Sequence, residues 1–315
     1  MRNAKIRAMD IIKQLKSFLK TAKNPLVVIL GPTASGKTAL SLKIAHEISG
    51  EIISTDSRQI YKGLEIGSAV LPLKERQGIP HHMIGIVNPD RAYSLAEYKD
   101  DATTIIEALR ARKHIPVLVG GTGLYISALT ENYDVPRIPP DKALRERLYK
   151  EAAKKGAETL HARLAKLDPA AAKRIHPNNL RYVVRALEIN LKTGKPKNDK
   201  KAGAKSSAKA KQDVFMIGIL RPREELYERI NRRVDEQIEQ GLTEEVRALL
   251  KHKYDETLPA MTSLGVKEII PFIRKKQTLN ECKETLKQNT RNYAKRQGTW
   301  FRRYENIHWI KAEDL

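Results

Sequence analysis

The residues with the clearest chemical potential lie at positions 31 to 38, which read GPTASGKT. Gly31, Gly36, Lys37 and Thr38 satisfy the pattern G-x-x-x-x-G-K-[ST], with an apolar run before it and a helical pattern after it. In this context backbone amides and a helix N-terminus bind anionic oxygens, the lysine adds positive charge, and the threonine hydroxyl can ligate Mg²⁺. The sequence therefore predicts a polyphosphate site with Thr38 as its metal ligand. The predicted residues of this site are Gly31, Pro32, Thr33, Ala34, Ser35, Gly36, Lys37 and Thr38.

A carboxylate follows the next predicted strand, in the segment STDSRQIY. Asp56 would lie at the end of that strand, where P-loop enzymes that act on ATP place an acid for magnesium. Aspartate and serine are also common N-cap residues of helices. Taken alone, Asp56 is therefore compatible with either role.

The elements that must position these residues alternate between strand and helix. From residue 25 to about 125, short apolar runs such as PLVVIL, EIIST and IPVLVGG are separated by helical patterns. Near-continuous apolar strands between helices predict an α/β fold, a P-loop-containing parallel sheet with helices on both faces.

The composition changes after residue 134 to Ala, Leu, Glu, Lys and Arg at helical spacing, and MIGIL at residues 216–220 is typical of a strand that returns to the sheet. We therefore expect a mostly helical domain inserted into the α/β core. The predicted boundaries are 1–24 for a basic N-terminal extension, 25–138 for the first part of the core, 139–212 for the insertion with a lysine-rich loop at 195–211, and 213–315 for the return strand and C-terminal helices.

The net charge of +22 indicates a polyanionic partner. Residues 195–211 hold seven lysines and one aspartate, and residues 1–24 hold seven basic residues and one acid. The rest of the chain still carries +10, so the surplus is not confined to these two segments. Such a surplus attracts nucleic-acid phosphates in a salt-dependent way.

The cysteine count and the apolar runs bear on the compartment. Cys282 is the single cysteine, which excludes an internal disulfide framework and a multi-cysteine zinc site. No apolar run approaches membrane-spanning length, so we expect no membrane partner. The chain is therefore expected in the cytoplasm. The basic, amphipathic pattern of residues 1–24 leaves an organellar targeting peptide as the alternative, although the segment has little serine and contains an acid.

Seven segments together resemble, in order, the tRNA dimethylallyltransferases, which prenylate an adenosine of tRNA. The resemblance covers about residues 26–303, and DSRQIY and GGTGLY at these distances from the P-loop are its most specific parts. The segments are GPTASGKT, DSRQIYKGLEIGSA, HHMIGIVNPDRAYSLAEY, LVGGTGLY, HPNNLRYVVRALEI, LRPREELYERINRRV and RNYAKRQGTWFRR.

The resemblance implies that the loop holds the diphosphate of dimethylallyl diphosphate, the leaving group when a carbon–oxygen bond breaks. Lys37 and Mg²⁺ on Thr38 would neutralise this group, and Arg223 would add charge to it. Asp56 would be the general base for the adenosine N6 amine, and Thr33 would make a supporting polar contact. The acceptor would be the adenosine 3′-adjacent to the anticodon, tRNA position 37, in tRNAs that read codons beginning with U.

The resemblance also implies contacts to the tRNA anticodon stem-loop. Tyr182 stands where many relatives have arginine, and Thr262 and Val266 depart from the family pattern as well, so no base contact is expected from the latter two. The implied contact residues are Asp56, Ser57, Arg58, Gln59, Thr122, Arg145, Arg181 and Arg185.

Three alternatives remain beside this interpretation. An adenylate isopentenyltransferase acting on free AMP, ADP or ATP would have the same P-loop and the same base as a tRNA dimethylallyltransferase. A P-loop kinase would have only the P-loop in common with it. A basic tRNA-binding protein without catalysis is the third, and Asp56 argues against it. GGTGLY, the helical insertion and the basic C-terminal segment favour tRNA as the acceptor. The expected oligomeric state is a monomer.

Overall fold

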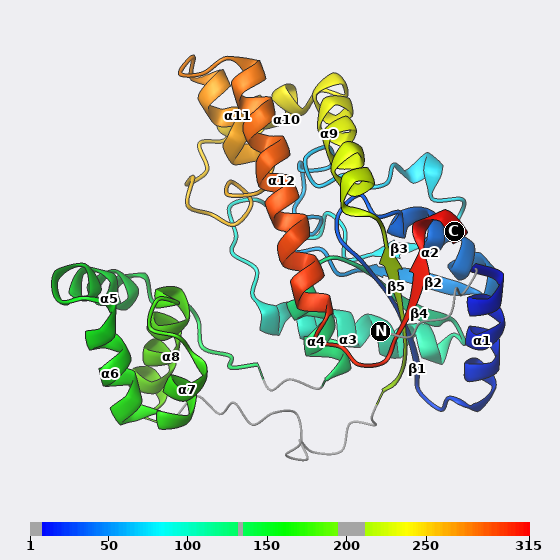
Figure 1. Ribbon diagram of the computed structural model, residues 1–315, viewed down its shortest axis with the longest axis horizontal. Coiled ribbons are helices and arrows are strands. Elements are labelled where there is room, and N and C mark those ends of the chain that lie inside the picture. The colour runs from blue at the N-terminus through cyan, green and yellow to red at the C-terminus, as the bar shows by residue number, and fades with distance from the viewer. Residues whose placement is uncertain (1–7, 132–134, 195–211) are drawn as a thin grey trace. The chain divides into compact units, whose positions relative to one another are not determined.

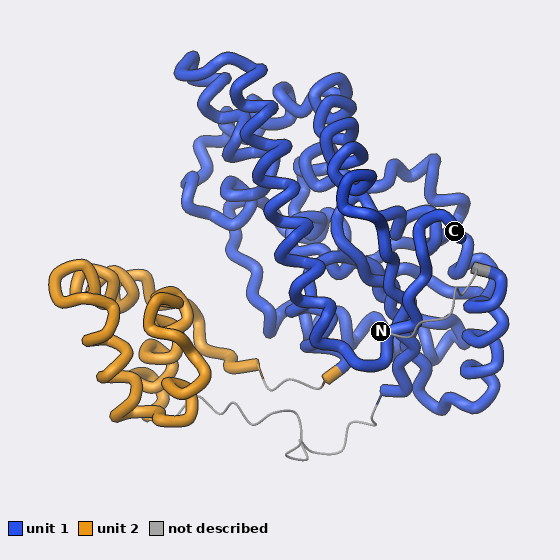
Figure 2. The backbone as a smooth tube through the Cα atoms, viewed as in Figure 1, with its two compact units in different colours: residues 1–130, 210–315 blue, residues 131–209 orange. Residues whose placement is uncertain are grey.

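The computed structural model describes residues 8–131, 135–194 and 212–315. Its backbone divides into two compact units, which Figure 2 colours separately. Unit 1 comprises Met1–Thr130 and Ala210–Leu315, and unit 2 comprises Glu131–Lys209. The inserted helical domain expected at 139–212 corresponds to unit 2, which starts eight residues earlier. The predicted lysine-rich loop lies outside the described residues.

Unit 1 is built on a six-stranded sheet in the order β3-β2-β4-β1-β5-β6, and every strand pair is parallel. The segment that contains MIGIL does return to the sheet, because it lies beside β1 with Val27 paired to Phe215. The strands are β1 Pro25–Leu30, β2 Gly50–Ser54, β3 His81–His82, β4 Ile115–Gly120, β5 Asp213–Leu220 and β6 Ile307–Lys311. The parallel sheet is therefore confirmed (Figure 1).

The two faces of the sheet are buried by different helices. Alternate residues of β1 enter two apolar clusters: Val27 and Ile29 in one, Val28 and Leu30 in the other. The first cluster includes side chains of α1 (Ala8–Thr21) and α2 (Lys37–Glu47). The second includes side chains of α3 (Leu95–Ala111) and α4 (Gly123–Thr130). Helices on both faces follow from strands that are apolar on both sides.

The C-terminal half of unit 1 adds a helical layer. The long helices α9 and α12 are in contact, and α12 also contacts α11 and α4. Its N-terminus is fixed by a capping box in which the Thr278 hydroxyl accepts from the Glu281 amide. The helices of this layer are α9 Arg223–Glu239, α10 Leu242–Lys251, α11 Val266–Ile273 and α12 Leu279–Phe301; the short turns of unit 1 are η1 Leu73–Glu75 and η2 Ala312–Asp314.

Unit 2 is a small helical bundle with its own apolar core. Leu148, Leu160, Leu164, Val183 and Leu187 are fully or almost fully buried in it. Its helices are α5 Lys142–Lys155, α6 Ala157–Leu167, α7 Pro169–Arg174 and α8 Leu180–Thr193.

The N-terminal extension is part of the core of unit 1 where the structure describes it. Ile11 and Leu15 of α1 are completely buried, and the ring of Phe18 lies 5.4 Å from that of Phe215. Across the described residues, no helix combines the length and the apolar character needed to span a bilayer.

Candidate active site

The loop between β1 and α2 has the backbone that its glycines predict. Gly36 has a φ of 107°, in the left-handed region that glycine adopts without steric cost. At Gly31 a Cβ atom would lie 2.7 Å from Ser35 Oγ, so a side chain there would displace the loop. The turn is closed by the Ser35 amide, which donates to the Pro32 carbonyl at 3.2 Å. The α2 helix begins at Lys37, so the free amides of its first turn directly follow this loop.

Lys37 is held against this loop as a partly buried cation. Its Nζ donates to the Pro32 carbonyl at 2.8 Å. Burial, and to a smaller extent the Arg233 guanidinium, lower the pKa of Lys37 to about 8, while Asp56 opposes the shift. Nearby Ser35 Oγ is buried and lacks a hydrogen-bond partner among the described residues. A bound anion would satisfy both groups.

Two arginines of α9 complete the cationic surroundings. Arg229 Nε donates to the Ala34 carbonyl at 2.9 Å, and Arg233 Nη1 donates to Thr33 Oγ1 at 3.2 Å. Arg233 is partly buried, and this burial lowers its pKa while Asp56 opposes the shift. These residues face the loop because they lie one helical turn apart on the same side of α9.

The structure does not bring Arg223 to the loop, which corrects the role expected for it. Arg223 is the first residue of α9, is exposed, and has its guanidinium 5.1 Å from the centre of the Tyr227 ring. It lines neither of the cavities at the P-loop. Arg229 and Arg233, further along the same helix, are the residues of α9 that hydrogen bond to the loop.

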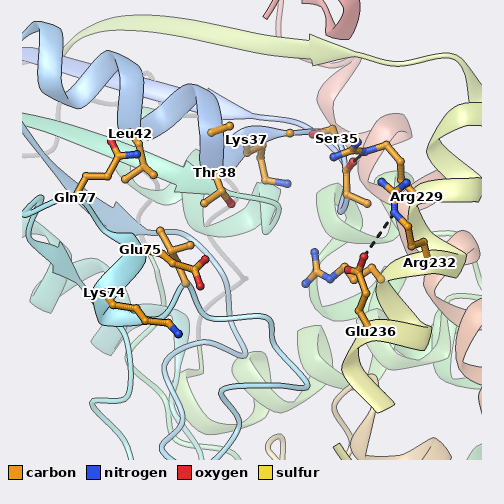
Figure 3. A pocket seen from close by; sticks show the side chains of 15 residues that line it. Ser35, Lys37, Thr38, Leu42, Lys74, Glu75, Gln77, Arg229, Arg232 and Glu236 are labelled. Carbon is orange, nitrogen blue, oxygen red and sulfur yellow. Dashed lines mark hydrogen bonds and ion pairs between the residues drawn. The ribbon is translucent and has the colours of Figure 1, made fainter. Parts of the chain in front are cut away.

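Two cavities adjoin the P-loop, and Lys37, Thr38 and Arg233 line both. The larger has a volume of about 690 Å³ (Figure 3). Lys74 and Glu75 of η1 line one side of it, and side chains of α9, among them Arg229 and Glu236, line the opposite side. The smaller, about 110 Å³, also contains Thr33, Asp56, Tyr293 and Gln297. Lys37 and Arg233 are thus shared between a larger, more open cavity and a smaller, more confined one.

Asp56 lies in the confined cavity, just past the end of β2. Its Oδ1 accepts a hydrogen bond from the Arg58 amide at 2.8 Å, which fixes the carboxylate in a local turn. Lys37, Arg233 and Tyr293 are close enough for their pKa values to respond to its charge. The structure therefore brings the predicted base and the predicted phosphate site together.

The residues after Asp56 mostly hold this turn in place. The Ser57 amide donates to Thr122 Oγ1 at 3.1 Å, which ties the turn to the end of β4. The side-chain amide of Gln59 makes two hydrogen bonds: its Oε1 accepts from Ser54 Oγ at 2.8 Å, and its Nε2 donates to the Ser68 carbonyl at 3.2 Å. The Arg58 guanidinium donates to the Pro259 carbonyl. Thus the Arg58 and Gln59 side chains, for which tRNA contacts are expected, already make internal hydrogen bonds.

Sequence reasoning missed two residues of α12 that cover the confined cavity. Gln297 is buried and links the segments that follow β1 and β4. Its Oε1 accepts a hydrogen bond from the Thr33 backbone amide at 2.9 Å, and its Nε2 donates to the Gly121 carbonyl at 3.0 Å. Tyr293, one turn earlier, hydrogen bonds with Thr122; burial, with Asp56 nearby, raises its pKa to about 12. The spacing of Tyr293 and Gln297 by four residues, amid exposed basic residues, is the signal that could have indicated them.

The remaining predicted contacts lie in unit 2, where two of them have a structural partner. Arg145 Nη2 lies 2.8 Å from Glu188 Oε2, and Arg185 pairs with the same carboxylate. Glu188 is completely buried. Arg181 is exposed, with its guanidinium 5.2 Å from the centre of the Tyr182 ring. Arg145 and Arg185 therefore neutralise a buried acid, whereas Arg181 is available to solvent.

Comparison with known proteins decides the family. A family model described as IPP transferase matches residues 59–304, which include Arg233, Tyr293 and Gln297. The chain belongs to the IPP transferase family. A second model, described as isopentenyl transferase, matches residues 24–80 alone.

Relatives of this IPP transferase agree over nearly the whole chain. It is 48% identical over 292 residues to the tRNA dimethylallyltransferase of Alkaliphilus oremlandii, covering 93% of each chain. It is 47% identical over 293 residues to that of Pelotomaculum thermopropionicum, covering 93% of this chain and 92% of the other.

Solved structures show the same fold. The tRNA isopentenylpyrophosphate transferase of Bacillus halodurans is similar with a TM-score of 0.67 and 41% identity, over 92% of this chain and 90% of that one. A eukaryotic dimethylallyltransferase acting on tRNA is similar with a TM-score of 0.76 and 31% identity, over 92% of this chain and 74% of that one.

Proposed function

We propose that this IPP transferase moves the dimethylallyl group of dimethylallyl diphosphate to N6 of the adenosine at tRNA position 37, 3′-adjacent to the anticodon, and releases diphosphate. The substrates are tRNAs that read codons beginning with U. The observation that carries the proposal is the confined cavity, in which Asp56 faces Lys37 and Arg233. This cavity combines a base for an amine with cations for a leaving diphosphate.

The leaving group is bound where positive charge is concentrated. The loop amides, Lys37 and Arg233 surround the position of the diphosphate, and Arg229, which lines the larger cavity, donates to the loop at the Ala34 carbonyl. As the carbon–oxygen bond breaks, its electron pair goes to the diphosphate oxygen. Fixed positive groups stabilise this developing charge without reorganising. The allylic carbon can then accept the lone pair of the amine.

The acceptor amine requires a base because its lone pair is delocalised into the purine ring. As the nitrogen–carbon bond forms, the N6 proton passes to Asp56. The Arg58 amide occupies Oδ1 of this carboxylate, which leaves Oδ2 for the proton. Tyr293 and Gln297 close the cavity on the side of α12 and limit access of water, which would otherwise compete for the allylic carbon.

The residues present fit a magnesium ion that arrives with the diphosphate. Mg²⁺ keeps several waters and is often bound through substrate phosphates and few protein ligands. Among the described residues no group of three His, Cys, Asp or Glu could hold a metal ion, whereas Thr38 lines both cavities. Thr38 would hold the ion through its hydroxyl. When bound, Mg²⁺ neutralises charge on the leaving diphosphate.

The adenine must leave its stack to reach Asp56, as in other enzymes that act on a base. We propose that the protein acts as a monomer. We place the protein in the cytoplasm, in keeping with its tRNA substrate and its single cysteine.

One experiment tests the acceptor. Labelled dimethylallyl diphosphate is supplied with unmodified tRNA, with AMP, or with no acceptor. We expect label on tRNA alone, at the adenosine next to the anticodon. Label on AMP but not on tRNA would assign the protein to the adenylate isopentenyltransferases, and phosphate transfer from labelled ATP would make it a kinase.

A further inference from the structure

The Ser35 carbonyl of the P-loop is held by Arg221, a residue that lines neither cavity at the loop. Arg221 directly follows β5, and its Nε and Nη2 donate to this carbonyl at 3.3 and 3.2 Å. Two donors of one guanidinium thus converge on one acceptor. Because the guanidinium is planar and its donors form a rigid fork, the contact fixes the direction of the carbonyl as well as its position.

Arg221 is itself fixed by its neighbours in the sequence. Pro222 follows it, and a residue before proline is largely confined to extended backbone conformations. Glu225, in the first turn of α9, accepts a hydrogen bond from Nη1 of Arg221. Only 8% of the Arg221 side chain is exposed. The guanidinium is therefore held between a carboxylate on one side and the P-loop carbonyl on the other.

The contact with the Ser35 carbonyl determines where the next amide points. The Ser35–Gly36 peptide bond is trans, since the described residues include no cis peptide bond. In a trans peptide the C=O and N–H bonds point in opposite directions. The Gly36 N–H therefore points away from Arg221. Gly36 lines the larger cavity and is the N-cap residue of α2, so the helix provides no partner for its amide.

The loop needs support from outside because part of its backbone is strained. Ala34 has a φ of 61°, in the left-handed region that a residue with a side chain disfavours. Arg229 donates to the Ala34 carbonyl at 2.9 Å, so two successive carbonyls are each held by an arginine. Burial and then the nearby Arg221 charge lower the pKa of Arg229, so the two guanidinium groups lie close together. Strained backbone persists only where its surroundings fix it.

Resting on the proposed function, we propose that Arg221 is a positioning residue for the donor: it holds the Ser35 carbonyl so that the Gly36 amide donates to the departing diphosphate. Arg221 touches neither substrate. Its effect on the reaction passes through one amide hydrogen bond to the leaving group. A hydrogen bond to a charged group is stronger than one between neutral groups, and this one strengthens as negative charge develops on the diphosphate.

The test compares R221Q and R221K with R223Q, a matched control that removes an exposed arginine of the same segment. Glutamine removes both the charge and the fork of donors, whereas lysine keeps the charge alone. We expect R221Q and R221K to bind inorganic diphosphate about 10- to 100-fold more weakly, the contribution of one hydrogen bond to a charged group. KM for dimethylallyl diphosphate should rise in parallel. Binding of unmodified tRNA, and every property of R223Q, should stay within about threefold of wild type.

A nuclear magnetic resonance signal reports on the amide directly. Serine labelled with ¹³C at its carbonyl and glycine labelled with ¹⁵N give correlations from Ser-Gly pairs alone, and the chain has two, Ser35–Gly36 and Ser49–Gly50. Gly50 begins β2 and is an internal control for folding. Inorganic diphosphate should shift the Gly36 signal in wild type at a concentration that leaves it unchanged in R221Q. The Gly50 signal should be the same in both proteins.

The outcomes separate this proposal from the proposed function. Wild-type protein that prenylates tRNA, with R221Q binding diphosphate as tightly as wild type, would overturn the role of Arg221 alone. R221K that binds diphosphate like wild type would also overturn it, because charge without the fork would then be sufficient. Wild-type protein that binds diphosphate but fails to prenylate tRNA would overturn the function. If R221Q lacks the Gly50 signal and is unfolded, R221K serves as the test variant, since it keeps a cation beside Glu225.

Discussion

The guanidinium of Arg233 donates a hydrogen bond to the hydroxyl of Thr33, which places α9 against the P-loop across 200 positions of sequence. Arg233 and Lys37 are both partly buried, which lowers the pKa of each, and the charge of Arg233 also lowers the pKa of Lys37. Asp56 is the acid that opposes this effect at both residues. The protein thus keeps an excess of buried positive charge until an anion binds.

Arg233→Ala should therefore impair use of the donor. We expect kcat/KM for dimethylallyl diphosphate to fall about 10²- to 10³-fold, because one fixed cation at the leaving group is lost. The melting temperature should stay the same or rise, since an uncompensated buried charge is removed. Arg223→Ala is the matched control on the same helix and should stay within about threefold. Equal losses in both variants would contradict the assignment of Arg233.

Asp56→Asn should abolish proton removal while keeping the turn, because the asparagine side-chain oxygen can still accept from the Arg58 amide. We expect the rate of transfer to fall about 10²- to 10⁴-fold, the usual contribution of a general base. Retention of tRNA on a filter should be largely unchanged. If retention is lost with activity, Asp56 binds tRNA and its role as base is not supported.

The stability of the ligand-free protein should depend on pH through Lys37, whose pKa falls from 10.5 to about 8 on folding. The unfolded chain binds more protons between these values, so stability rises with pH across this window. Below pH 8 the charged lysine costs on the order of 2–4 kcal/mol. Lys37→Met, of similar shape, should accordingly be more stable than wild type at pH 7. Measured by urea unfolding, the difference in the free energy of unfolding between Lys37→Met and wild type should shrink towards pH 10.5. A difference that is constant with pH would show that the pKa of Lys37 is not its cause.

Glu188 of unit 2 should be essential for the stability of that helical bundle. Glu188→Ala leaves Arg145 and Arg185 without their buried partner, and breaking such a pair typically costs about 3–5 kcal/mol. Thermal unfolding without tRNA should show the loss. Arg145→Ala should also destabilise unit 2, whereas Arg181→Ala, which removes an exposed side chain, should not. If Arg145→Ala does not change thermal unfolding, Arg145 does not stabilise unit 2, and tRNA contact remains as the role of Arg145.

The sequence predicted those features that local pattern determines. The P-loop backbone follows from Gly31 and Gly36, and the strands follow from runs that are apolar on both faces. Asp56 could be placed at the loop because the ends of parallel strands meet at one edge of the sheet. These features need no knowledge of how distant segments pack.

Features set by tertiary packing were harder to predict. Arg223, Arg229 and Arg233 are alike in sequence, and the rotation of α9 decides which of them face the loop. The pairing of Arg145 with Glu188 depends likewise on how α5 and α8 pack within unit 2, whereas Arg185 lies three residues before Glu188 on the same helix. A basic residue in a tRNA-modifying enzyme can serve the fold instead of the ligand.

The burial of α1 has a consequence for proteolytic processing. Ile11 and Leu15 are completely buried in the apolar cluster that also contains Leu40 and Phe215. Lys16 anchors the same helix to Glu47 of α2. A protease that cut before Pro25 and released α1 would expose the part of this cluster that Ile11 and Leu15 cover. Residues 8–21 therefore contribute to the folded core of the enzyme. A leader peptide that is removed after synthesis would have to end before residue 8.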